Sequence, residues 1–156
     1  MPKFGSASLK NLGTCQNDLQ ILAKEVVKTY DFACIFGHRT PEQQHKLFEQ
    51  GRTQIGGVWT VTSPIDIVTQ CDGFEILSAH NQFPSHAMDL APCINGKISW
   101  DKCQCYHFNG FVTGVAEMLL HQGKMQHRIR SGADWDSDRD VNDQKLRDLV
   151  HFEIII

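Results

Sequence analysis

Two histidines and an aspartate lie close together in a segment that is otherwise built of small and apolar residues. The segment "SAHNQFPSHAMDLAP" covers residues 78–92 and contains His80, His86 and Asp89. Burial of an unpaired carboxylate costs roughly several kcal/mol, because the charge loses its hydration. A divalent metal ion beside Asp89 would offset this cost, and histidine and aspartate are ligands that zinc uses.

The alternation of side chains along a strand indicates which histidine accompanies Asp89. If residues 86–91 form a strand, Asp89 points to one face and His86 points to the other. His80 is separated from this segment by a loop, so it is free to fold back toward the aspartate. We therefore predict His80 as the partner of Asp89 and keep His86 as the alternative.

A third ligand and a possible base occur in the segment "DLVHFEIII", residues 148–156. His151 lies in an apolar, strand-like setting, where a lone histidine is more often a hydrogen-bonded core residue. Asp148, three residues earlier, favours a different interpretation, because a carboxylate near a ligand histidine can act as a general base in metal-assisted hydrolysis. A catalytic zinc takes three protein ligands and keeps one position open. The chain can supply these from His80, Asp89 and His151.

An arginine stands at the start of a strongly marked helix. Thr40 and Gln43 form a capping box, and Pro41 occupies the first helical position. Arg39 comes directly before this helix and shortly after the apolar run 32–36, which we predict to be a buried strand. A guanidinium at the junction of a strand and a helix start is well placed to meet an anionic or carbonyl group.

The other elements must bring these distant segments together. Interleaved strands and helices with hairpin signals predict an α+β fold, in which helices pack on a small, mainly antiparallel sheet. Without internal repeats or linkers, residues 1–156 are expected to form a single domain. We predict helices over 17–30 and 108–122, strands over 58–62, 73–77, 127–131 and 150–156, and a tight hairpin within 94–100.

Composition excludes some functions. A net charge of −3 provides no basic surface for a phosphate backbone, so no nucleic-acid partner is expected. No apolar run reaches the roughly 18 residues of a membrane helix, and the first residues do not resemble a signal peptide. We therefore expect synthesis in the cytoplasm, no stable membrane insertion and free thiols at the six cysteines.

An acidic run, "DWDSDRDVND", covers residues 134–143. Its alternating aspartates resemble the start of a calcium-binding loop. Arg139 stands where such a loop needs glycine, and Lys145 stands where it needs a bidentate glutamate. We interpret the run as a solvated loop. A substrate-facing role for Trp135 or Asp136 and a weak calcium site are the alternatives.

Three motifs follow one another in the order of a known family. They are "GHRTPEQQHKLFEQGRT" (37–53), "SAHNQFPSHAMDL" (78–90) and "DLVHFE" (148–153). The chain resembles the zinc peptidases of bacterial cell walls, which comprise D-Ala-D-Ala carboxypeptidases and dipeptidases and the L-alanyl-D-glutamate endopeptidases used as phage endolysins. The family patterns are G-x-R-[ST], S-x-H followed by A-x-D, and D-x-x-H-[FW]-E. The resemblance implies the LAS-type fold, which is also called Hedgehog–DD-peptidase-like.

The resemblance also implies a role for each matching residue. The zinc ligands would be His80, Asp89 and His151. Asp148 would be the catalytic carboxylate, where some members use glutamate, and Arg39 would bind the substrate carbonyl and the developing oxyanion. Ser78 would hydrogen-bond the substrate or the groups around the ligands. The segment "GADWD" (132–136) also resembles the family's segment ahead of the last motif, and we include its Trp135 among the substrate-binding candidates. The loop between His80 and Asp89 is two residues longer than is common in the family.

The leading functional expectation is an endolysin that cuts the stem peptide of peptidoglycan between L-Ala and D-Glu. We expect a monomer without a separate wall-binding domain, made in the host cytoplasm and acting in the periplasm after release. One alternative is a D-Ala-D-Ala carboxypeptidase or dipeptidase of cell-wall metabolism. Another is a zinc-bearing binding domain without catalysis.

Overall fold

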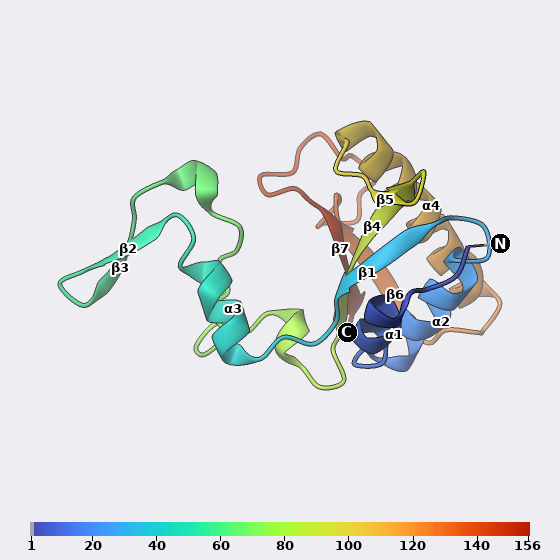
Figure 1. Cartoon of the computed structure of the whole chain (residues 1–156), viewed down its shortest axis with the longest axis horizontal. Helices are drawn as coiled ribbons and strands as arrows, with labels where there is room; N and C mark the ends of the chain where they lie inside the picture. Colours follow the sequence, from blue (N-terminus) through green and yellow to red (C-terminus); the bar gives the residue numbers. More distant parts are fainter. Residues whose placement is uncertain (1) are drawn as a thin grey trace.

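The computed structural model describes residues 2–156 and is built around an antiparallel sheet (Figure 1). Its strand order is β1-β4-β7-β6, and the short β5 pairs with β4. All pairings in this sheet are antiparallel, which confirms the predicted fold class. The strands are β1 (Phe32–Phe36), β4 (Ala87–Ile94), β5 (Lys97–Ile98), β6 (Arg128–Gly132) and β7 (Asp148–Ile155).

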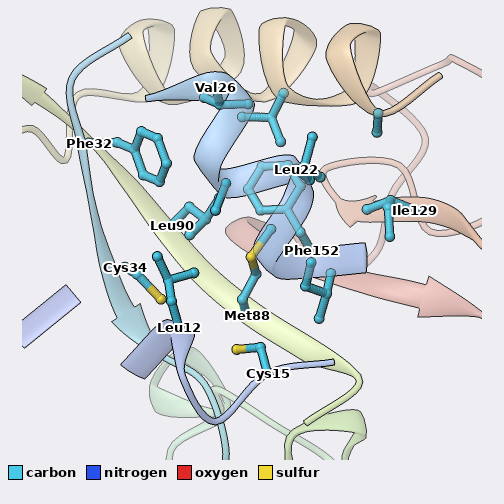
Figure 2. Close-up of a cluster of buried hydrophobic side chains, with 14 of the residues drawn as sticks. Leu12, Cys15, Leu22, Val26, Phe32, Cys34, Met88, Leu90, Ile129 and Phe152 are labelled. Carbon is cyan, nitrogen blue, oxygen red and sulfur yellow. The ribbon is translucent and has the colours of Figure 1, made fainter. Parts of the chain in front are cut away.

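Three helices form one hydrophobic core with the sheet. They are α1 (Ser6–Leu12), α2 (Asn17–Val26) and α4 (Lys102–His121). Figure 2 shows Leu22 of α2, Leu90 of β4 and Phe152 of β7 within this core. Burial of one such side chain contributes about 1.5–3 kcal/mol. Because alternate strand residues face opposite sides, the core position of Leu90 directs its neighbour Asp89 to the other face of the sheet.

The chain segment that connects β1 to β4 forms a lobe that projects from the sheet (Figure 1). We call its residues 41–77 the α3 lobe. It contains α3 (Pro41–Phe48), the hairpin of β2 (Arg52–Ile55) and β3 (Val58–Val61), and the 3-10 turn η1 (Pro64–Asp66). His45 packs against Phe48, Trp59 and Phe74, with ring centroids 5.4–5.8 Å apart. The lobe is thus organised around a small aromatic cluster separate from the main core.

The strand predicted at 73–77 is wrong. This segment forms bends, because the Asp72 Oδ1 oxygen accepts the backbone N–H groups of Phe74, Glu75 and Ile76 at 2.8–2.9 Å. An aspartate that satisfies several successive amides offers the backbone an alternative to strand pairing. The apolar residues of this segment suggested a strand, and the preceding aspartate decided its conformation.

Other boundaries differ by a few residues. The helix predicted over 108–122 begins at Lys102, because the Asp101 side chain caps it by accepting the Gln104 N–H at 2.9 Å. The first predicted helix ends at Val26, and α1 has no counterpart among the predictions. The predicted hairpin is confirmed: Asn95 and Gly96 have φ angles of 52° and 73°, as a tight turn between antiparallel strands requires.

Candidate metal centre

The structure brings His80, Asp89 and His151 together on the sheet face opposite the core. His80 Nε2 lies 3.1 Å from Asp89 Oδ1 and 3.2 Å from His151 Nδ1, and Asp89 Oδ1 lies 3.3 Å from His151 Nδ1. Ligand atoms about 2.0–2.1 Å from a tetrahedral zinc ion are separated by roughly 3.3 Å. The three donor atoms therefore fit one face of a zinc coordination tetrahedron.

Each of the three side chains comes from a different element. Asp89 in β4 and His151 in β7 are register partners in the antiparallel sheet. His80 lies in a 3-10 turn, η2 (Ala79–Asn81), where Ser78 Oγ accepts the His80 N–H at 3.3 Å. The loop from this turn to β4 folds His80 back onto Asp89. His86, the alternative, is not part of the cluster.

The outer nitrogen of each histidine has a fixed partner. His80 Nδ1 donates to the Gly37 carbonyl at 2.6 Å, and His151 Nε2 donates to Glu153 Oε2 at 2.9 Å. These bonds leave His80 Nε2 and His151 Nδ1 with free lone pairs that face Asp89. Such partners set the tautomer and the ring orientation of metal-ligating histidines. A side chain at Gly37 would overlap Asn11 O, so only glycine fits there.

Arg39 pairs with the oxygen of Asp89 that faces away from His80. Its Nη2 contacts Asp89 Oδ2, and its guanidinium lies 4.7 Å from the Phe36 ring centre. Burial alone would raise the pKa of Asp89, but the polar contacts of its carboxylate with the His151 and His80 rings and the charge of Arg39 hold this pKa well below its usual range. Asp89 is therefore a carboxylate at neutral pH and can serve as a ligand.

Asp148 stands at the start of β7, where the pairing with β6 is irregular. Gly132 is opposite Asp148 while Ser131 is opposite Phe152, so β7 contains extra residues at this point. A Cβ at Gly132 would lie 2.9 Å from Asp148 Cβ and 3.0 Å from Trp135 Cζ2. Burial, and secondly the charge of Asp89, raise the pKa of Asp148. A carboxyl group with a raised pKa beside a ligand set is suited to proton transfer.

The three candidate ligands line a cleft of about 760 Å³ between the sheet and the α3 lobe. The lobe contributes Gln44, Leu47 and Leu77 to its walls. The Trp135 ring lies 5.2 Å from the His151 ring. All the residues to which we assigned roles line this cleft: Arg39, Ser78, His80, Asp89, Trp135, Asp148 and His151.

Three supporting residues were missed at the level of sequence. Gly37 and Glu153 hold the outer nitrogens of the two histidines, and Arg130 binds Glu153. Gly37 and Glu153 lie within the quoted motifs, so a signal was available for them. Arg130 lies in a segment that showed only a strand pattern.

The acidic loop is organised by its own hydrogen bonds. Asp134, Asp136 and Asp138 have carboxylate oxygens within 4.8 Å of one another. Asp134 accepts the N–H groups of Asp138 and Arg139 at 3.2 and 3.0 Å, and Asp136 accepts from Gln144 at 3.0 Å. These bonds account for the folded shape of the loop.

The six cysteines are free. Burial raises the pKa of Cys15 to about 11, so this thiol stays protonated and unreactive at neutral pH. Among residues 2–156, no helix combines the length and the apolar character needed to cross a membrane.

Three candidate ligands in an open cleft, beside a carboxyl group with a raised pKa, are typical of a hydrolytic metal site. Comparison with known proteins identifies the class. The phage L-alanyl-D-glutamate peptidase family matches residues 1–155, and the chain belongs to this family. It is therefore a peptidase, a hydrolase of the L-alanyl-D-glutamate type, as the motifs suggested.

Two relatives illustrate the family and its fold. The chain is 28% identical over 159 residues to the L-alanyl-D-glutamate peptidase of Escherichia phage T5, and the match covers 98% of each chain. It is similar in fold to the crystal structure of the Serratia marcescens L-Ala D-Glu endopeptidase ChiX, with a TM-score of 0.65 and 18% identity. That match covers 97% of this chain and 89% of the other.

Proposed function

We propose that this chain is a phage endolysin that hydrolyses the L-Ala–D-Glu bond in the stem peptide of peptidoglycan, with Zn²⁺ held by His80, Asp89 and His151. The observation that carries the proposal is the convergence of three donor atoms at 3.1–3.3 Å in the cleft that Asp148 also lines. Two imidazole nitrogens and one carboxylate oxygen are a donor set that suits zinc. When bound, Zn²⁺ supplies the Lewis acidity that makes water nucleophilic near neutral pH.

Asp148 is the proposed proton carrier. Its carboxylate takes a proton from the water that attacks the scissile carbonyl carbon. As the C–N bond breaks, the same group passes that proton to the departing amine, so the carboxylate is regenerated. Its raised pKa supports this role, because a base with a pKa closer to neutrality both accepts and returns the proton more readily.

Arg39 is proposed to donate a hydrogen bond to the scissile carbonyl oxygen as negative charge develops there. Arg39 lines the cleft, and its pairing with Asp89 keeps the guanidinium beside the ligands. Removal of one such donor typically costs about 3 kcal/mol of transition-state stabilisation.

Trp135 and Ser78 are proposed to contact the substrate within the cleft that both residues line. Trp135 offers a flat apolar surface next to His151, against which a stem peptide can lie. Ser78 lines the same cleft, and its hydroxyl, which caps the turn of His80, retains a proton that it can donate. Both roles concern substrate position and not bond cleavage.

The biological setting is also a proposal. Residues 1–156 would act as a single catalytic domain and as a monomer on peptidoglycan. Membership in a phage peptidase family supports synthesis in the host cytoplasm and action on the wall in the periplasm after release.

Digestion of purified sacculi with the zinc-loaded protein tests the proposal. Mass spectrometry of the products is expected to show new N-terminal D-Glu, and treatment with a chelator should abolish its formation. Release of D-Ala without new N-terminal D-Glu would identify a carboxypeptidase. A complete lack of zinc-dependent products would leave only a binding domain and would refute the proposed activity.

A further inference from the structure

Glu153 connects a metal-ligand candidate to an arginine. One of its carboxylate oxygens accepts from His151 Nε2 at 2.9 Å. The other accepts from Arg130 Nε at 2.7 Å and from Arg130 Nη2 at 2.6 Å. The side chain of Glu153 is only 12% exposed, so these bonds are largely shielded from water. Both oxygens of the carboxylate are thereby engaged in one geometry.

Arg130 also contacts Trp135, which lines the same cleft. Its Nη1 donates to the Trp135 carbonyl oxygen at 3.0 Å, and its guanidinium carbon lies 5.6 Å from the centre of the Trp135 ring. Trp135 in turn lies against the His151 ring at 5.2 Å. The contacts therefore form a closed circuit from His151 through Glu153, Arg130 and Trp135 back to His151.

We propose that Arg130 is a positioning residue: through Glu153 it orients His151 as an Nδ1 ligand, and through the Trp135 carbonyl it fixes the aromatic wall of the cleft. This inference rests on the proposed zinc site and deepens it. One side chain would then set both the metal affinity and the shape of the substrate cleft, although it touches neither the metal nor the scissile bond.

A comparison of the partners of His80 and His151 explains why only the His151 ring needs this support. The ring of His80 is held by a backbone carbonyl, that of Gly37, whose position follows from the fold. The ring of His151 depends on a flexible glutamate, which can adopt other rotamers unless a second group holds it. Arg130 is that second group, because two of its N–H donors converge on one carboxylate oxygen. The planar, forked guanidinium binds the Glu153 carboxylate and the Trp135 carbonyl at the same time, whereas a lysine ammonium could hold only one of them.

Arg128 supplies a matched control. It stands two residues earlier on the same strand, β6, and carries the same charge. It is exposed, and its nearest acidic partner is Glu117 at 4.0 Å, not Glu153. A general electrostatic effect on the metal would act through both arginines, whereas a positioning effect would act through Arg130 alone.

The first arm of the experiment measures zinc affinity by competition with a chromophoric chelator. Loss of an outer partner of a ligand histidine typically weakens metal binding by about 10–100-fold. We expect this loss for Arg130→Leu and for Glu153→Gln, since an amide cannot accept from both His151 and Arg130. The double variant should lose little more than either single variant, because both changes break one chain of contacts. Arg128→Leu should stay within about twofold of the wild type.

The second arm measures the fluorescence of Trp135 in zinc-free protein whose Trp59 and Trp100 are replaced by Phe. Arg130→Leu should shift the Trp135 emission. Arg130→Lys provides a conservative test, because its ammonium group can still bind Glu153 but cannot also hold the Trp135 carbonyl. It should therefore restore most of the zinc affinity while it leaves the emission shifted. A merely structural role of Arg130 would not separate these two readouts.

Zinc affinities of Arg130→Leu and Glu153→Gln that both match the wild type in folded protein would overturn the inference. An equal loss in Arg128→Leu would do the same. If the wild type itself bound no zinc, the proposed function would fail instead. The fluorescence arm would then still decide, because an unshifted Trp135 emission in Arg130→Leu would refute the positioning role.

Discussion

The helix-backed sheet and the α3 lobe are built in different ways. Phe108 of α4 and Phe152 of β7 are completely buried between the sheet and its three helices. The lobe leaves large apolar residues in solvent, with Ile65 93% and Val58 65% exposed. A two-stranded hairpin like β2–β3 has little stability of its own in water. The comparison indicates that the sheet is the rigid half of the molecule and the lobe the more easily deformed half.

The cleft combines the two regions unequally. Asp89, His151 and Asp148 all belong to the sheet, whereas the lobe supplies wall residues such as Gln44 and Leu77. The lobe joins the sheet next to the site, where the Arg39 N–H donates to the His80 carbonyl at 2.9 Å. Changes in the sheet should therefore abolish chemistry or folding, and changes in the lobe should mainly weaken substrate binding.

The largest expected effect concerns the proposed catalytic and metal-binding residues on the sheet. Asp148→Ala should retain zinc and the fold but lose about 100- to 10 000-fold in turnover, the usual contribution of a general acid–base group. His151→Ala should instead lose the metal, because one of three ligands is removed. Hydrolysis of sacculi and metal analysis of both purified variants separate the two results. Near-normal turnover of Asp148→Ala would refute the assignment of the base.

The second prediction compares stability in the two regions. Phe108→Ala should lower the free energy of unfolding by about 3–5 kcal/mol, because it leaves a cavity in a close-packed core. Trp59→Ala in the lobe should cost less, since the ring is partly exposed and its neighbours can relax. Urea unfolding of both variants provides the measurement. Equal losses would show that the lobe is as tightly packed as the sheet.

A third prediction concerns the attachment of the lobe wall. Gln44 is buried, and its Nε2 donates to Thr69 Oγ1 and to the Cys71 carbonyl, both at 3.2 Å. Gln44→Leu should lose about 1 kcal/mol of side-chain hydrogen bonding at each contact. We therefore expect KM to rise several-fold and kcat to stay nearly unchanged. Steady-state kinetics on soluble muropeptides test this split. A fall in kcat with constant KM would place Gln44 in the chemistry.

The smallest expected effect lies in the core region, away from the cleft. Asp18 Oδ2 accepts from the backbone N–H groups of Gln126 and His127 and from His127 Nδ1 at 2.8–2.9 Å. Burial opposes ionisation, but these bonds lower the pKa of Asp18 below its ordinary value. The resulting stability is present above the unfolded-state pKa of about 3.9 and is lost as the pH falls through the lower folded-state value.

Asp18→Asn tests this contribution. The variant should be about 1–2 kcal/mol less stable at pH 7, because an amide is a weaker acceptor for three N–H groups. The difference from the wild type should shrink as the pH falls below about 4. Urea unfolding at several pH values measures both quantities. A constant difference down to pH 2 would contradict the assigned shift.

Local signals in the chain were sufficient for much of the fold. The capping box of Thr40 and Gln43 is present, and the Asn95-Gly96 hairpin is formed. Strand alternation favoured His80 over His86 as the partner of Asp89, and His86 is not part of the cluster. These features depend on residues a few positions apart, so the sequence contains all the information that they need. The strand prediction for 73–77 failed because the apolar pattern of the segment was outweighed by the hydrogen bonds of the Asp72 side chain.

The sequence by itself determined which residue types carry the chemistry and, through ordered motifs, which family they belong to. Only the tertiary structure decided how they are held. The contacts of Glu153 with Arg130 and of His80 with the Gly37 carbonyl depend on strand register and loop path. Such contacts join positions up to 43 residues apart and leave no local pattern. The physical reason is that hydrogen bonds across a folded sheet depend on distances that chain order does not encode.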